Sequence, residues 1–108
     1  MDWDNGRPLR IIICGDTVQT DSNRDLFEKG AVKDLVGTEL YTKLADSDVS
    51  VFNLEAPLTD YDKKIYKPGA PCIASSSKAI NFFSNVSSKK VLLSCANNHI
   101  KDYDLKGI

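Results

Sequence analysis

The stretch RIIICGD at residues 10–16 decides the fold, because it joins a continuous apolar run to a glycine and a carboxylate. Three consecutive β-branched residues favour a strand, and an apolar run without alternation is typical of a strand covered on both faces in a parallel sheet. Gly15 is expected to end this strand. The sequence therefore predicts a buried strand over residues 10–14, with Asp16 just beyond its carboxyl end.

Two further strands are predicted along the chain, VSVFNL at residues 49–54 and VLLSC at residues 91–95. Both are short and rich in Val, Leu or Phe, which is the composition of buried strands. A short helix over 25–29 is expected to end at Gly30. Apolar residues at three- and four-residue spacing predict a helix over 38–45. Its core face is expected to carry Leu40, Tyr41, Leu44 and Ala45.

The segment over residues 56–74 holds three of the four prolines and is predicted to be a loop without helix. Serines at positions 75–77 are expected to cap a helix whose core residues are Ala79, Ile80 and Phe83. Residues 102–108 are predicted to open another helix. The lysines and tyrosines of the loop are expected to be solvated, although contact with an anionic substrate is the alternative. They are Tyr61, Lys63, Lys64, Tyr66 and Lys67.

The order strand, helix, strand, helix, strand predicts an α/β fold, a layered parallel sheet with flanking helices. One domain over residues 9–108 follows a short extension over residues 1–8, where Trp3 is expected to pack on the outside. The carboxyl ends of parallel strands share one edge of a sheet, and open α/β folds bind ligands at that edge. Functional residues are therefore expected there.

Composition excludes several classes of function. The 14 Lys and Arg nearly balance the 15 Asp and Glu, so the chain lacks the basic surplus that nucleic-acid binding requires. Its apolar runs are far shorter than the ~20 residues of a membrane span. The acidic, polar residues 1–6 do not form a signal peptide, which predicts a cytoplasmic protein. Three cysteines without C-x-x-C spacing argue against disulfides or a structural zinc site, so Cys14 and Cys95 are predicted to be buried thiols.

Each predicted strand is followed by side chains that could bind a metal ion. Carboxylate and amide oxygens together with neutral imidazole suit Mn, Zn, Fe or Mg. A carboxylate directly after a buried strand costs free energy unless it is paired or bound to a cation, which favours Glu55 as functional. Asp16 and the Asn97-Asn98 pair could instead be turn residues, and His99 a hydrogen-bonded loop residue. The candidates are Asp16, Asn53, Glu55, Asn97, Asn98, His99 and Asp102.

Three blocks occur in order: Gly15-Asp16, NLEAPLT at residues 53–59, and ANNH at residues 96–99 followed by Asp102. Together they resemble the bacterial capsule synthesis protein CapA family, which is associated with poly-γ-glutamate capsules. The resemblance covers about residues 10–108. That family is similar in turn to the calcineurin-like metallophosphoesterases, layered α/β proteins with a two-metal centre. The resemblance therefore implies a metallophosphoesterase-like fold.

The resemblance also implies a role for each matching residue. Asp16 would bind a first divalent metal ion, Glu55 would lie near or between two ions, and Asn98 would bind the second. His99 would act as general acid or stabilise the transition state, and Asp102 would orient His99 or its loop. The implied substrate is a phosphoester or an anionic polymer. The implied substrate-binding residues are Thr17, Asn53 and Asn97.

Two departures from the calcineurin-like pattern bear on the metal centre. That pattern has a histidine two residues after its first Asp, where this chain has Val18. The family also places further histidine ligands in a carboxyl-terminal half, whereas His99 is the single histidine here. The sequence therefore predicts the amino-terminal portion of a longer domain, inactive alone and completed by a carboxyl-terminal half or another chain.

An exposed sheet edge predicts self-association. Members of the family are often membrane-anchored and extracellular.

Three other functions are alternatives to a metal-dependent hydrolase. A non-catalytic subunit that binds or assembles capsule polymer would have the same fold. An ester hydrolase of the Gly-Asp-Ser type would use Thr17 in place of serine, but it needs its histidine after its aspartate, and here His99 precedes Asp102. A flavodoxin-like phosphate binder is disfavoured because the loop after Gly15 lacks the glycines that let backbone amides approach a phosphate.

Overall fold

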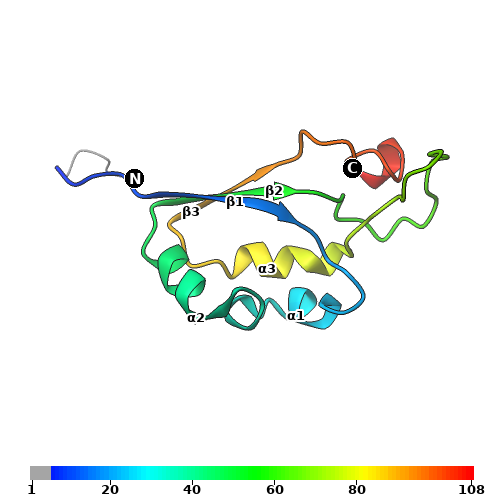
Figure 1. Ribbon diagram of the computed structural model, residues 1–108. Helices are drawn as coiled ribbons and strands as arrows, with labels where there is room; N and C mark the ends of the chain where they lie inside the picture. Colours follow the sequence, from blue (N-terminus) through cyan, green and yellow to red (C-terminus); the bar gives the residue numbers. More distant parts are fainter. Residues whose placement is uncertain (1–5) are drawn as a thin grey trace.

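The computed structural model describes residues 6–108, so Trp3 and the first residues of the extension lie outside the described residues. Its centre is a sheet of strands β1 (Ile11–Thr17), β2 (Val49–Leu54) and β3 (Lys90–Ser94) in the order β1-β2-β3. Both pairs of neighbouring strands are parallel. The predicted α/β fold is confirmed, and the three carboxyl ends point toward the same side of the molecule (Figure 1).

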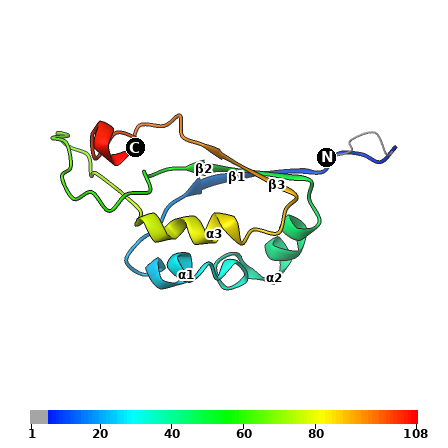
Figure 2. The same cartoon turned by 180° about the vertical axis from the view of Figure 1, so that it is seen from behind.

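Helices α1 (Arg24–Lys29), α2 (Val32–Ala45) and α3 (Ile80–Ser84) lie on the same face of the sheet (Figure 1 and Figure 2). A short 3-10 turn, η1 (Ser77–Ala79), leads into α3. Four aromatic rings join helices to sheet. The Phe82 ring centroid lies 4.9 Å from that of Phe27 and 5.9 Å from that of Phe52, and Phe83 packs against both Phe82 and Phe52. These rings form the centre of the core.

Strand β1 continues beyond the point where the sequence predicts its end. Gly15 does not end it, because Asp16 and Thr17 still pair with β2, opposite Asn53 and Leu54. The register shifts between Ile13 and Asp16, so the irregular step is absorbed inside the strand as a bulge. The carboxylate of Asp16 consequently projects from the last pairs of the sheet rather than from a loop.

The predicted burial of β1 on both faces is wrong within the described residues. Ile13 is 80% exposed, Ile11 52% and Leu92 of β3 46%, because α1, α2 and α3 cover only the opposite face. Cys14 points to the helical side and is half-buried. Cys95 is exposed, contrary to the prediction, since β3 ends one residue before it. All three cysteines are free thiols.

Helix α2 contains a break that the sequence pattern missed. Gly37 has φ +81° and ψ 164°, so the helix consists of two pieces, of which only the second matches the predicted helix over 38–45. Leu44 is buried, and Leu40 and Tyr41 pack partly against the core. Ala45 is exposed at the last helical position and does not face the core as predicted. As predicted, Gly30 ends α1, with φ +66° in the left-handed region.

The second half of the chain departs from the expected helices in detail. Ser76 precedes η1 without a side-chain cap, because its hydroxyl donates to Glu28 Oε1 at 2.8 Å instead. Ile80 is 43% exposed and does not face the core as predicted. Phe82 is buried in the core instead, beside Phe83. Residues 56–74 contain no helix, as predicted. Beyond them, residues 102–108 form turns and a short 3-10 helix, η2 (Leu105–Gly107).

A buried carboxylate anchors the amino ends of the strands, opposite the expected site. Asp48 forms a bidentate pair with Arg7, lies 3.1 Å from Lys89 Nζ, and accepts from the Arg10 backbone N–H at 2.9 Å. The Arg7 guanidinium and the Arg10 amide hold the pKa of Asp48 well below its usual range. Asp48 is thus a structural acid.

Among the described residues, the helices are too short or too polar to span a lipid bilayer.

Candidate functional site

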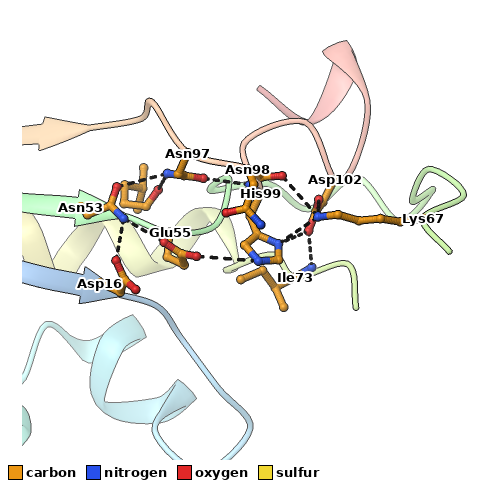
Figure 3. A network of polar contacts seen from close by, with 10 residues as sticks. Asp16, Asn53, Glu55, Lys67, Ile73, Asn97, Asn98, His99 and Asp102 are labelled. Atoms are coloured by element: carbon orange, nitrogen blue, oxygen red, sulfur yellow. Dashed lines mark hydrogen bonds and ion pairs between the residues drawn. The ribbon is translucent and has the colours of Figure 1, made fainter. Parts of the chain in front are cut away.

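A single amide joins the ends of β1 and β2. Asn53 Nδ2 donates to Asp16 Oδ1 at 2.7 Å and to Glu55 Oε2 at 2.8 Å, as Figure 3 shows. Asp16 and Asn53 are paired across the two strands, and Glu55 follows β2 directly. The two carboxylates therefore approach the same nitrogen atom, which places them at one edge of the sheet as the parallel topology predicts.

The imidazole of His99 lies on the other side of Glu55. His99 Nε2 is 3.7 Å from Glu55 Oε1, and the two side chains are 13% and 18% exposed. This contact becomes an ion pair when the ring is protonated. A segment that follows β3 thus delivers the histidine to the edge where β1 and β2 present their carboxylates (Figure 3).

Asp102 holds the opposite side of the His99 ring. Its carboxylate is 1% exposed, and Oδ2 lies 2.6 Å from His99 Nδ1 and 2.8 Å from the Ile73 backbone N. Oδ1 accepts from Lys67 Nζ at 2.8 Å. Burial opposes ionisation, but the hydrogen bonds from Lys67, His99 and Ile73 outweigh it, so the pKa of Asp102 is lowered. An ionised carboxylate only accepts hydrogen bonds, so His99 Nδ1 carries the proton.

Asn97 ties the histidine segment to β2. Its side-chain Nδ2 donates to the Leu54 carbonyl at 2.7 Å and to Asn53 Oδ1 at 3.2 Å. Its Oδ1 accepts from the His99 backbone N–H at 3.0 Å. These contacts place His99 relative to the strands, and they occupy the amide groups of Asn97. The substrate-binding roles of Asn53 and Asn97 stay predictions.

Two predicted site residues stand apart from this network. The side chain of Asn98 is exposed, and the contact that its residue makes is through the backbone carbonyl, which accepts from Lys67 Nζ at 3.3 Å. Thr17 Oγ1 donates to the Gly15 carbonyl at 3.2 Å. Within residues 6–108 there is no group of three or more His, Cys, Asp or Glu placed to hold a metal ion. The predicted ligand set of Asp16, Glu55 and Asn98 stays a prediction.

Lys67 is the residue that sequence reasoning missed. The expectation of a solvated side chain is wrong for it, because the side chain is only 22% exposed and pairs with buried Asp102. Lys63, Lys64 and Tyr66 are exposed as expected, and Tyr66 reaches 90%, whereas Tyr61 is half-buried, contrary to the expectation. No local pattern marks Lys67, since its partner is 35 residues away and no regular element links the two.

Two hollows flank this region. One of about 260 Å³ lies below the end of β1, where Asp16 and Thr17 border a lining that includes Cys14 and Phe52. A larger hollow of about 560 Å³ lies near α1 and contains none of the predicted site residues. The network from Asp16 to Asp102 holds an imidazole between two carboxylates, which the lining of the larger hollow lacks, so the network is the better candidate.

Comparison with known families agrees with the motifs that this network contains. The family model described as bacterial capsule synthesis protein PGA_cap matches residues 10–108, which include β1, β2, β3 and every residue of the network. The chain belongs to this family. The match confirms the resemblance to capsule synthesis proteins that the three sequence blocks indicate. No curated protein and no solved structure gave a match in the corresponding searches.

Proposed function

We propose that this PGA_cap protein takes part in metal-dependent hydrolysis of a phosphoester during capsule synthesis. The observation that carries the proposal is the continuous network in which Asn53 joins Asp16 to Glu55, and His99 joins Glu55 to Asp102. Carboxylates beside an oriented imidazole are the groups that such a reaction needs for charge stabilisation and proton transfer.

His99 is the proposed proton donor. Asp102 engages Nδ1, so Nε2 is the nitrogen directed at the carboxylate edge, and the side chain retains 13% exposure. When protonated, Nε2–H can donate to the oxygen of a leaving group bound at that edge. Buried Asp102 keeps the ring from rotating and stabilises its positive charge. Proton donation therefore requires both residues.

Asp16 and Glu55 are the proposed metal ligands on this chain. Two carboxylates are too few for a closed site, and the described residues do not supply a third acidic or imidazole ligand in place. The residues therefore do not fit a complete metal centre by themselves. We propose that Asn98 and ligands beyond the described residues, from the same protein or another chain, complete it. A bound divalent ion would polarise a phosphoryl oxygen and activate water.

Two variants test the hydrolase. With an aryl phosphate as substrate and Mn²⁺ present, phosphate release is expected once the additional ligands complete the metal centre, and it is expected to be lost when Glu55→Gln or His99→Ala is introduced into that completed protein. Glu39→Gln is the matched control, because Glu39 is exposed on α2 and its ion pair within residues 6–108 is with Lys43 of the same helix. Full activity in both site variants, or equal loss in the control, would end the proposal.

A non-catalytic role in binding or assembling an anionic polymer is the second candidate. It is favoured by Lys63 and Lys64, which are exposed beside Tyr66 on the segment that reaches the site through Lys67. Poly-γ-glutamate is the natural probe for this role. Binding that survives chelation of metal ions and falls in a Lys63→Ala, Lys64→Ala double variant would support the binding subunit, provided that phosphate release is absent.

A further inference from the structure

We propose that Lys67 is a positioning residue that acts through Asp102 to hold the His99 ring with Nε2 directed at the carboxylate edge. The inference deepens the proposed function and rests on it for its catalytic consequence. Lys67 Nζ donates to Asp102 Oδ1 at 2.8 Å and to the Asn98 carbonyl at 3.3 Å, and it lies 3.4 Å from His99 Nδ1. Figure 3 shows it on the side of Asp102 away from the strands.

The two oxygens of Asp102 have separate partners. Oδ1 accepts from Lys67, while Oδ2 accepts from His99 Nδ1 and from the Ile73 backbone N–H. Three donors on two oxygens fix the plane of the carboxylate, and that plane fixes the direction of the Nδ1–H bond. The ring orientation therefore depends on the donor at Oδ1 as well as on the contact at Oδ2.

Lys67 also supplies the permanent positive charge next to this carboxylate. Asp102 is 1% exposed, and in the part of the chain that the structure describes its other ionic partner is the His99 ring. A buried carboxylate without a cation is costly. Without Lys67, the ionised Asp102 would lack its permanent cation, and a neutral Asp102 could donate to Nδ1 instead of accepting from it, so the ring would exchange between its two tautomers.

The rest of the segment converges on the same residue. The Ile65 backbone N–H donates to the Asp102 carbonyl at 2.9 Å, and Ile73 N–H donates to its side chain. Lys67 lies between Ile65 and Ile73 in the sequence, and of these three residues it alone carries a charge. The conformation of residues 65–73 is thereby linked to the orientation of the His99 ring. An ordinary surface ion pair would not create such a link.

The single histidine makes the proposal measurable. His99 is the only source of imidazole ¹⁵N signals in the chain, and the shifts of its two nitrogens report which one carries the proton when the ring is neutral. The protein should show one tautomer, with the proton on Nδ1. Lys67→Met should give averaged shifts at both nitrogens, Lys67→Arg should restore the single tautomer, and Lys64→Met in the same segment should leave it unchanged.

This measurement needs no enzymatic activity, so it separates the inference from the proposed hydrolase. Wild-type shifts in Lys67→Met, or the same averaging in Lys64→Met, would overturn the positioning role whether or not phosphate is released. If Lys67→Met does not fold, Lys67→Gln keeps a donor but removes the charge, and the same two outcomes apply to it. Where activity is found, Lys67→Met should lower kcat and leave KM unchanged, because Lys67 contacts Asp102 and the Nδ1 side of His99 rather than the carboxylate edge.

Discussion

Replacing Asp102 tests the buried centre of the network. The carboxylate is 1% exposed and accepts from Lys67, His99 and the Ile73 N–H. Removing one partner of a buried ion pair costs about 3–5 kcal/mol, and each hydrogen bond to a charged group contributes roughly 1.5–3 kcal/mol. Asp102→Asn keeps one acceptor oxygen but turns an NH₂ group toward a donor. We expect the free energy of unfolding of Asp102→Asn to be about 3 kcal/mol lower than that of the wild type at pH 7.

Urea unfolding followed by circular dichroism measures this loss, with thermal unfolding as a second readout. In a domain of this size, a loss of about 3 kcal/mol lowers the midpoint temperature by roughly 10–20 °C. Asp102→Ala, which retains no acceptor, should lose more and can fail to fold, so Asp102→Asn is the variant that decides. Asp62→Asn is the control, because Asp62 is an exposed carboxylate in the segment over residues 56–74.

The lowered pKa of Asp102 predicts how the free energy of unfolding depends on pH. The pKa of Asp102 is lower in the folded protein than its ordinary value of 3.8, so the carboxylate stabilises the fold above that pH. This stabilisation is lost as the pH falls through the folded-state pKa. The difference in the free energy of unfolding between the wild-type protein and Asp102→Asn should therefore become smaller below about pH 4. A loss under about 1 kcal/mol at pH 7, or a gap that stays constant down to pH 3, would refute the reasoning.

Three further predictions concern the core, a turn and the open face. Phe82→Ala should cost about 3–5 kcal/mol in urea unfolding, whereas Ile80→Ala on the same helix, 43% exposed, should cost far less; equal losses would contradict the assigned core. Gly30→Ala should destabilise by more than about 1 kcal/mol, since φ is +66° and a Cβ would lie 2.7 Å from the Asn81 carbonyl oxygen; wild-type stability would contradict this. Ile13→Glu should reduce self-association in sedimentation experiments at little cost in stability, because Ile13 is 80% exposed; unchanged association would exclude the open face as the contact.

Local pattern was sufficient where one signal dominates. Strand β2 has the predicted bounds because an apolar run ends at a polar cluster on one side and at Glu55 on the other. Strand β1 was predicted too short, because a glycine can sit inside a strand as a bulge as readily as it ends one. The first half of α2 was missed because Gly37 interrupts its periodicity. Burial on both faces was wrongly predicted, since an apolar run does not specify what covers it.

The site was predictable as far as topology determines it. Parallel strands bring Asp16, Asn53 and Glu55 to one edge whatever the loops do, and the structure places them there. The contact between Lys67 and Asp102 was not predictable, because it depends on the path of a loop without regular structure. Motif resemblance supplied the role of His99, and the family match confirms the resemblance without testing that role.

The most direct test of the proposed site is paramagnetic broadening of the single imidazole. Mn²⁺ bound between Asp16 and Glu55 would lie close to His99, because Glu55 Oε1 is 3.7 Å from Nε2. The His99 ring signals should broaden at substoichiometric Mn²⁺ in the protein and in Glu39→Gln, and should stay sharp in Glu55→Gln. Ring signals that remain sharp in the protein at millimolar Mn²⁺, or broaden equally in Glu55→Gln, would contradict a cation site at this edge.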